Sequence, residues 1–132
     1  MREPIWIEKR EVLLAHSRQL AEHGGSDGIR DEGLLDSALA KPKNVFAYAD
    51  EVSLARLAAS YAFGIARNHP FIDGNKRTAL VASEGLLRFN GHRVEAAPED
   101  KYLTFLSLAR GSLSEAALAD WFEQHLQPIK GL

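Results

Sequence analysis

Apolar residues recur at intervals of three and four along nearly the whole chain of 132 residues. This spacing places them on one face of an α-helix, so it predicts packed helices rather than a sheet. Glycines, prolines and capping residues divide the pattern into successive segments. We therefore expect a mostly all-α fold: a compact helical bundle of about six helices with at most a short strand or hairpin.

The limits of the first two helices follow from residues that cap or break helices. A helix is predicted over about residues 9–22, ended by the glycine pair at 24–25. Asp31 is placed to cap the second helix, which we expect to stop before Pro42 because proline breaks the helical hydrogen-bond ladder. Residues 43–49 show no helical period, and we expect a partly extended loop or a small hairpin there.

The next two helices carry the strongest apolar faces. The third is predicted from Asp50 to about Asn68, and small residues dominate its face, so neighbouring helices can approach it closely. We expect this helix to be central. The fourth is predicted to begin at about Asn75 and to end at the Asn-Gly pair at 90–91.

The C-terminal third of the chain predicts one short strand and two more helices. The strand is expected at residues 92–95, and Pro98 is placed to start the fifth helix. Ser112 and Glu115 have the spacing of a capping box for the last helix.

Composition is typical of one globular domain and excludes thiol chemistry. Hydrophobic residues make up 45% of the chain and charged residues 26%. We expect a single domain over 1–132, with its core at about residues 4–126. The chain contains no cysteine, which excludes disulfides, thiolate zinc sites and a cysteine nucleophile.

Net charge and hydropathy argue against two classes of partner. The net charge is −2, whereas a protein that binds nucleic acid directly is usually clearly basic. The N-terminal residues lack the apolar core of a signal peptide, and no window approaches the roughly 18 apolar residues of a membrane span. We therefore expect a cytoplasmic protein that binds neither nucleic acid nor membrane by itself.

The string HPFIDGNKR at residues 69–77 separates two strongly helical segments. Rigid helices on both sides of such a loop point its side chains and amides at one place. Imidazole exchanges protons readily near neutral pH, so His69 is a candidate base. Asp73 offers the hard oxygen that Mg²⁺ prefers. Pro70 and Phe71 are predicted to anchor the loop in the core.

The second half of the string has the properties of an anion-binding turn. Gly74 permits a positive φ and a close approach of the backbone to a ligand. Asn75 is expected to cap the helix and to offer its amide to an anion. Lys76 and Arg77 lie in the first helical turn, where exposed N–H groups already favour anions. Two cations are unfavourable in that turn for the helix alone, which indicates that an anion is expected there.

Each residue of the string is ordinary when taken singly, because His-Pro often ends a helix and Asp-Gly-Asn is a common turn. The ordered string resembles the signature of the Fic family, in which His-Pro-Phe precedes a variable residue, an acidic residue and Gly-Asn-Gly-Arg. The match holds at His69, Pro70, Phe71, Asp73, Gly74, Asn75 and Arg77.

Two departures from that signature resemble the Doc branch of the family. Members that transfer AMP carry glycine in place of Lys76 and usually a second arginine in place of Leu80. The run Asn-Lys-Arg-Thr-Ala-Leu at 75–80 is a hallmark of Doc-like members. Residues 28–39 and 86–94 resemble them too, so the resemblance covers about residues 4–126.

The resemblance implies an ATP- and Mg²⁺-dependent transferase that phosphorylates a hydroxyl side chain of a target protein. His69 would be the general base and Asp73 the metal ligand. Gly74, Asn75 and Lys76 would form the anion-binding turn, and Arg77 would pair with a phosphate. In Doc relatives the target is elongation factor Tu, whose modification stops translation.

Partners and regulation also follow from the resemblance. Many Fic enzymes inhibit themselves through Ser or Thr followed four positions later by Glu, and no Ser or Thr of this chain has that Glu. A toxin without self-inhibition implies a separate antitoxin, similar to the Phd partner of Doc. Residues 43–49 are either a flap that docks the target as an added strand or a plain surface loop.

Two rival functions stay open at this level. An AMP transferase would use the same fold but attack a different phosphorus. A catalytically silent Fic scaffold would act by binding alone, although base, metal ligand and phosphate-binding residues are all in place. The remaining histidines, among them His16, show no metal-ligand spacing, which favours surface or core roles for them.

Overall fold

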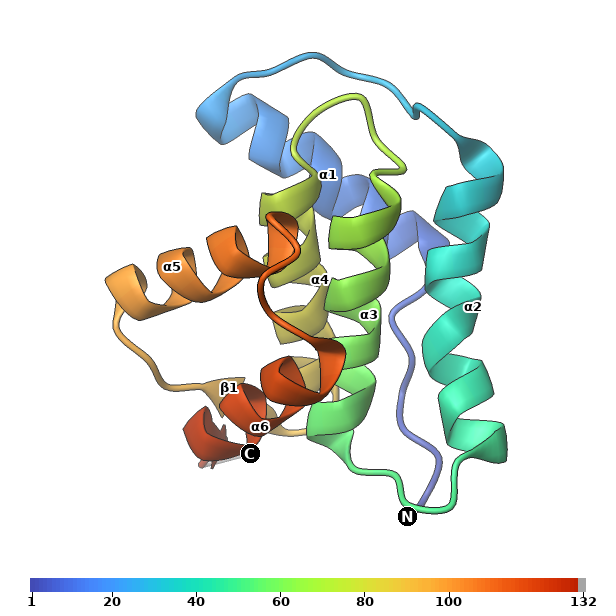
Figure 1. The fold of residues 1–132 in the computed structure, drawn as a ribbon, viewed down its shortest axis with the longest axis vertical. Helices are drawn as coiled ribbons and strands as arrows, with labels where there is room; N and C mark the ends of the chain where they lie inside the picture. The colour runs from blue at the N-terminus through green and yellow to red at the C-terminus, as the bar shows by residue number, and fades with distance from the viewer. Residues whose placement is uncertain (131–132) are drawn as a thin grey trace.

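A computed structural model describes residues 1–130, and its architecture is helical with one small sheet (Figure 1). The elements are α1 (Lys9–His23), α2 (Glu32–Tyr48), α3 (Leu54–Asn68), α4 (Asn75–Phe89), β1 (His92–Val94), α5 (Pro98–Ala109), α6 (Glu115–His125) and β2 (Leu126–Pro128). The mostly α-helical fold class is thus confirmed. None of the helices in the described range has the length and apolar character needed to cross a membrane.

Helix α3 lies in the middle of the bundle, as its small residues predicted. It contacts α2, α4, α5 and α6, and Figure 1 shows it between these neighbours. Helix α1 packs on α4 instead. At Gly64 a Cβ atom would stand 3.2 Å from the Cβ of Ala38 in α2, so the two helices approach as closely as a glycine allows. The loop that follows α3 is therefore held by the best-buried helix of the fold.

A buried hydrogen bond ties the N-terminal segment to α3. The hydroxyl of Tyr61 donates to the carbonyl of Ile7 at 3.0 Å. Burial, with Glu8 nearby, raises the pKa of the Tyr61 phenol above its ordinary value, so the phenol stays a neutral donor. This bond fixes the extended residues that lead into α1.

The expected end of the second helix before Pro42 is wrong, and so is the expected loop at 43–49. Helix α2 continues through Pro42 to Tyr48. A proline inside a helix costs one backbone hydrogen bond. Here Pro42 is buried, while Val45 and Phe46 pack against the core and Phe46 meets Trp6 edge-to-face. Apolar burial outweighs the local cost, and a helical segment cannot serve as the added-strand flap.

Two helix starts also differ from the prediction. Asp50 does not open the third helix, because Ser53 caps it, and Ser114 rather than Ser112 caps the last one. Each serine accepts the N–H three residues ahead, which is the usual bond of an N-cap. Glu115 is then the first helical residue, so the predicted capping box does not form.

The small sheet closes the bundle at the end of α4. The predicted strand is confirmed as β1, and it pairs antiparallel with β2, with Arg93 opposite Gln127. The strand β2, which begins at Leu126 directly after α6, was not predicted from the sequence. Pairing along three residues on each side holds the segment after α6 against the exit of α4.

Candidate active site

The loop between α3 and α4, together with the first turn of α4, carries the predicted site residues. It comprises residues 69–74 and lies in Figure 1 beneath the segment that joins α1 to α2. Phe71 is fully buried, with 1% of its surface exposed, and Pro70 is buried as well. His69 and Asp73 are exposed on the same loop. The predicted anchor thus lies in the core and leaves the reactive groups in solvent.

The backbone of His69 is in the left-handed conformation, with φ 48° and ψ 55°. Among the described residues no other non-glycine has a positive φ. Such a conformation costs on the order of 1 kcal/mol and persists where the surroundings fix it, often at functional sites. The protein therefore tolerates a small loss of stability that fixes the orientation of the candidate base.

Arg30 supplies the surroundings that hold this conformation. Its Nε donates to the carbonyl of His69 at 2.6 Å and its Nη2 to the carbonyl of Asn68 at 2.8 Å. The backbone N–H of Arg30 donates to the carbonyl of Pro70 at 2.7 Å. Carbonyls at a helix C-terminus lack partners and attract cations. Arg30 thus closes the end of α3 and fixes the entry to the loop.

Replacing Arg30 with glutamine is expected to lower the free energy of unfolding by about 1–2 kcal/mol, because the two carbonyls lose a charged, forked donor. Arg30→Lys keeps the charge without the fork and should fall between the two. Urea denaturation of the three proteins measures the order. Equal stability of Arg30→Gln and the wild type would contradict the role assigned to Arg30.

Asn75 closes the loop from the other side. Its Oδ1 accepts the N–H of Phe71 at 3.0 Å, and its Nδ2 donates to the carbonyl of Phe71 at 2.9 Å. The same Nδ2 lies 3.5 Å from Nδ1 of His69. The expected cap at Asn75 is wrong, since Gly74 holds the N-cap position. Because the carboxamide is used within the loop, only the backbone N–H of Asn75 is left to face an anion.

Asp73 offers one exposed carboxylate at the start of α4. Its Oδ1 accepts the N–H of Gly74 at 2.8 Å, and its Oδ2 accepts the N–H of Ser26 at 3.3 Å. Within residues 1–130 no cluster of three or more His, Cys, Asp or Glu side chains could enclose an ion. One carboxylate fits Mg²⁺ that takes its other oxygens from phosphate and water, as is usual at nucleotide sites.

Cations line the other side of the turn. Arg77 is exposed, and Nζ of Lys76 lies 4.5 Å from the centre of the Tyr102 ring of α5. A cavity of about 360 Å³ opens between α4 and α5. Its lining combines cations with apolar groups and comprises Lys76, Arg77, Leu80, Pro98, Lys101, Tyr102 and Phe105. This combination of cations and apolar groups can bind a polyanion.

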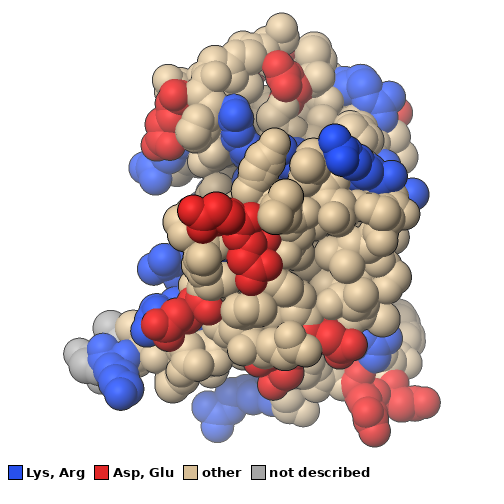
Figure 2. Space-filling model, turned by 60° about the vertical axis from the view of Figure 1, so that its left-hand side comes forward, with Lys and Arg blue, Asp and Glu red and all other residues tan. Residues whose placement is uncertain are grey.

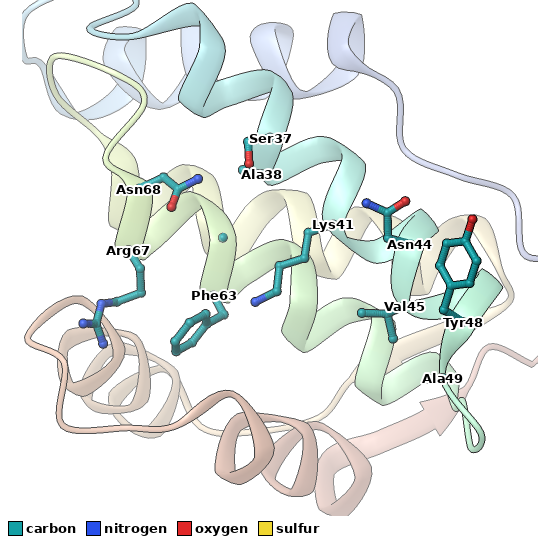
Figure 3. A pocket seen from close by; sticks show the side chains of 11 residues that line it. Ser37, Ala38, Lys41, Asn44, Val45, Tyr48, Ala49, Phe63, Arg67 and Asn68 are labelled. Carbon is teal, nitrogen blue, oxygen red and sulfur yellow. The ribbon is translucent and has the colours of Figure 1, made fainter.

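A second hollow lies between α2 and α3, and Asn68 is among the residues that line it. It measures about 590 Å³, and Figure 3 shows Lys41, Phe63 and Arg67 among its walls. Lys41 and Arg67 both lie over the Phe63 ring, at 4.5 and 5.5 Å from its centre. Arg67 therefore contributes to the wall of this hollow.

Surface charge is mixed outside the site. Figure 2 shows one face on which Lys and Arg side chains lie among Asp and Glu side chains, without either sign covering the face. This agrees with the small net charge of −2. A ligand or partner would meet local charge at the loop rather than a uniform field.

Two residues of the site were missed by sequence reasoning. The sequence analysis assigned no role to Arg30 and a surface or core role to His16. His16 is buried beneath the loop, where its Nε2 lies 2.8 Å from the carbonyl oxygen of Asp73. His16 and Val12 are the buried residues of α1, but no sequence pattern identified the partner of His16.

The family model described as "Fic/DOC family" matches residues 6–87, which include the whole loop and most of α4. The chain belongs to the Fic/DOC family. The matched range contains every predicted site residue, and the resemblance seen in the sequence is thus confirmed at the level of the family.

Two Doc proteins are similar to the chain over most of its length. "Protein kinase doc" of Escherichia phage P1 is 33% identical over 114 residues, which cover 86% of this chain and 90% of that protein. "Toxin Doc" of Mycolicibacterium smegmatis is 38% identical over 92 residues, 69% of this chain and 68% of that protein. This Fic/DOC chain is thus a Doc-type member.

Two solved Fic structures show a more distant likeness. The BepC effector protein of Bartonella tribocorum, with bound AMPPNP, has a TM-score of 0.49 at 22% identity. The N-terminal Fic domain of a Bep effector protein of Bartonella quintana, with bound ADP, has a TM-score of 0.48 at 22% identity. Each match covers 73% of this chain, which spans about half the length of those two structures.

Proposed function

We propose that this Doc-type toxin transfers the γ-phosphoryl group of MgATP to a hydroxyl side chain of a target protein. The observation that carries the proposal is the loop itself: an exposed imidazole, a carboxylate and an arginine within residues 69–77, at the start of a helix. The chain that presents them is 33% identical to a protein named a kinase, over 90% of that protein.

Each group of the loop has a distinct role in the proposed transfer. His69 takes the proton from the target hydroxyl, whose oxygen bonds to the γ-phosphorus while the bond to the β–γ bridging oxygen breaks and ADP leaves. Asp73 would hold Mg²⁺, which supplies charge neutralisation at the phosphates when bound. The N–H of Gly74 already bonds to the Asp73 carboxylate, so Gly74 shapes the turn, while the backbone N–H groups of Asn75 and Lys76 face the phosphates. Arg77 pairs with one of the phosphates.

The choice of the γ-phosphorus rests on Lys76 and Leu80. Lysine in place of glycine crowds the backbone turn that would otherwise surround the α- and β-phosphates, and it adds a point charge. The position of Lys76 against Tyr102 leaves its charge at the cavity between α4 and α5. Leu80, which lines the same cavity, replaces the second arginine of AMP-transferring members.

Target, partner and compartment complete the proposal. Elongation factor Tu is the proposed target, so its phosphorylation would stop translation in the cytoplasm. A Phd-like antitoxin is the proposed partner, because the chain carries no inhibitory Ser/Thr-to-Glu motif of its own. An antitoxin of this kind would fold on binding.

Labelled ATP tests the reaction directly. Purified toxin, freed of antitoxin, is incubated with elongation factor Tu, Mg²⁺ and ATP labelled at either the α or the γ position. We expect label on the target from γ-labelled ATP only. Label from α-labelled ATP would establish AMP transfer instead. No label from either, with a folded toxin and a cell lysate as additional substrate, would establish a silent scaffold.

A further inference from the structure

The second half of α1 lies directly beneath Asp73. His16 is 4% exposed, and its Nε2 is 2.8 Å from the carbonyl oxygen of Asp73. A carbonyl only accepts hydrogen bonds, so Nε2 carries the proton and donates. The imidazole also stacks on the ring of Phe71, with 3.8 Å between ring centres and 9° between planes. One side chain of α1 thus contacts both the anchor and the acidic residue of the loop.

The exit of α1 contacts the other end of Asp73. The N–H of Ser26 donates to Oδ2 at 3.3 Å. A Cβ atom on Gly25 would stand 2.7 Å from the same oxygen, closer than real Cβ contacts allow. A Cβ on the neighbouring Gly24 would meet nothing within 4 Å. Position 25 therefore must stay free of a side chain for the carboxylate to keep its place.

We infer that His16, Gly25 and Ser26 are positioning residues that hold Asp73 at its backbone and at its carboxylate, ready to receive a magnesium-bound phosphate. The inference rests on the proposed function for its consequence. Physically, a ligand group fixed by neighbours before binding loses less conformational freedom when the ligand arrives. Groups that orient a metal ligand commonly change metal affinity by 10- to 100-fold when removed.

Two substitutions at His16 separate its two contacts. His16→Phe keeps a ring against Phe71 but loses the donor to Asp73. His16→Gln keeps an N–H donor near the Nε2 position and loses the ring. We expect calorimetry to show MgATP binding about tenfold weaker in His16→Phe, with most of the affinity recovered in His16→Gln. His23→Phe, at the exposed end of the same helix, is the control.

Two substitutions in the glycine pair form a matched test. Gly24 and Gly25 both have positive φ, 78° and 124°, so alanine at either brings backbone strain. Only alanine at 25 meets the carboxylate. We expect Gly25→Ala to weaken MgATP binding about tenfold and to raise the Mg²⁺ concentration needed for half-maximal transfer. Gly24→Ala should bind MgATP like the wild type.

The outcomes separate this inference from the proposed function. Equal MgATP affinity in Gly25→Ala and Gly24→Ala would overturn the positioning role, as would wild-type affinity in a folded His16→Phe. Amide hydrogen exchange at Gly74 gives a readout without ligand: it should accelerate in His16→Phe and stay unchanged in His23→Phe. If the wild type binds no MgATP, the proposed function fails, and unchanged exchange in His16→Phe would still refute the contact.

Discussion

Replacing His69 with alanine is expected to abolish phosphoryl transfer and growth inhibition while the chain keeps its fold. A general base contributes about 10²- to 10⁴-fold to a rate, and a toxin slowed that far should no longer arrest growth. The His69 side chain is exposed, so its loss leaves no cavity. We expect the free energy of unfolding to change by less than about 1 kcal/mol. Transfer from γ-labelled ATP and colony counts after induction measure the effect.

The control for His69→Ala is His23→Ala. His23 is an exposed histidine at the end of α1, and its removal should leave transfer and toxicity at the wild-type level. Both variants are compared by circular dichroism and thermal denaturation to confirm the fold. Growth arrest by His69→Ala equal to that by the wild type would mean that toxicity does not depend on this imidazole.

Replacing Phe71 with alanine is expected to cost about 3–5 kcal/mol of unfolding free energy, because a fully buried aromatic ring is removed from the core. Phe71 is 1% exposed, and its replacement also removes the stack of its ring on the His16 ring. Small domains are stable by only about 5–15 kcal/mol, so much of the protein's stability depends on this ring. The urea midpoint measures the loss.

The neighbouring Ile72→Ala gives a matched comparison on the same loop. Ile72 is 56% exposed, so its truncation should cost well under about 1 kcal/mol. If the two substitutions cost the same, Phe71 does not anchor the loop as its burial indicates. If Phe71→Ala is too unstable to purify, the milder Phe71→Leu replaces it. Phe71→Leu should still cost more unfolding free energy than Ile72→Ala.

Periodicity predicted the helices well because their apolar faces are set by the local sequence. The predicted end of the second helix at Pro42 was wrong, because contacts between distant segments determine whether the helix continues there. The helix continues because Val45 and Phe46 reach the core and Phe46 meets Trp6 from the N-terminal segment. A local rule for proline contains no information about such packing. The same limit applies to β2, whose partner β1 lies more than thirty positions earlier.

The sequence alone suggests the reactive residues of the candidate site but not the residues that support them. His69 and Asp73 belong to one contiguous string with a recognisable order. His16 and Arg30 act on backbone carbonyls that lie 57 and 39 positions away. Every residue has the same backbone carbonyl, so the type of the accepting residue does not indicate that such a bond is made. Residue patterns therefore could not reveal these two contacts.

The close approach at Gly64 has a consequence for the chemistry. It sets the gap between α2 and α3 one helical turn before the reactive loop. Arg30 precedes α2, and its guanidinium bonds to the last carbonyls of α3. A methyl group at position 64 would stand 3.2 Å from the Cβ of Ala38, so α2 would have to move slightly away from α3. The missing side chain at Gly64 therefore lets α2, and the arginine before it, dock closely on the helix whose end carries the imidazole.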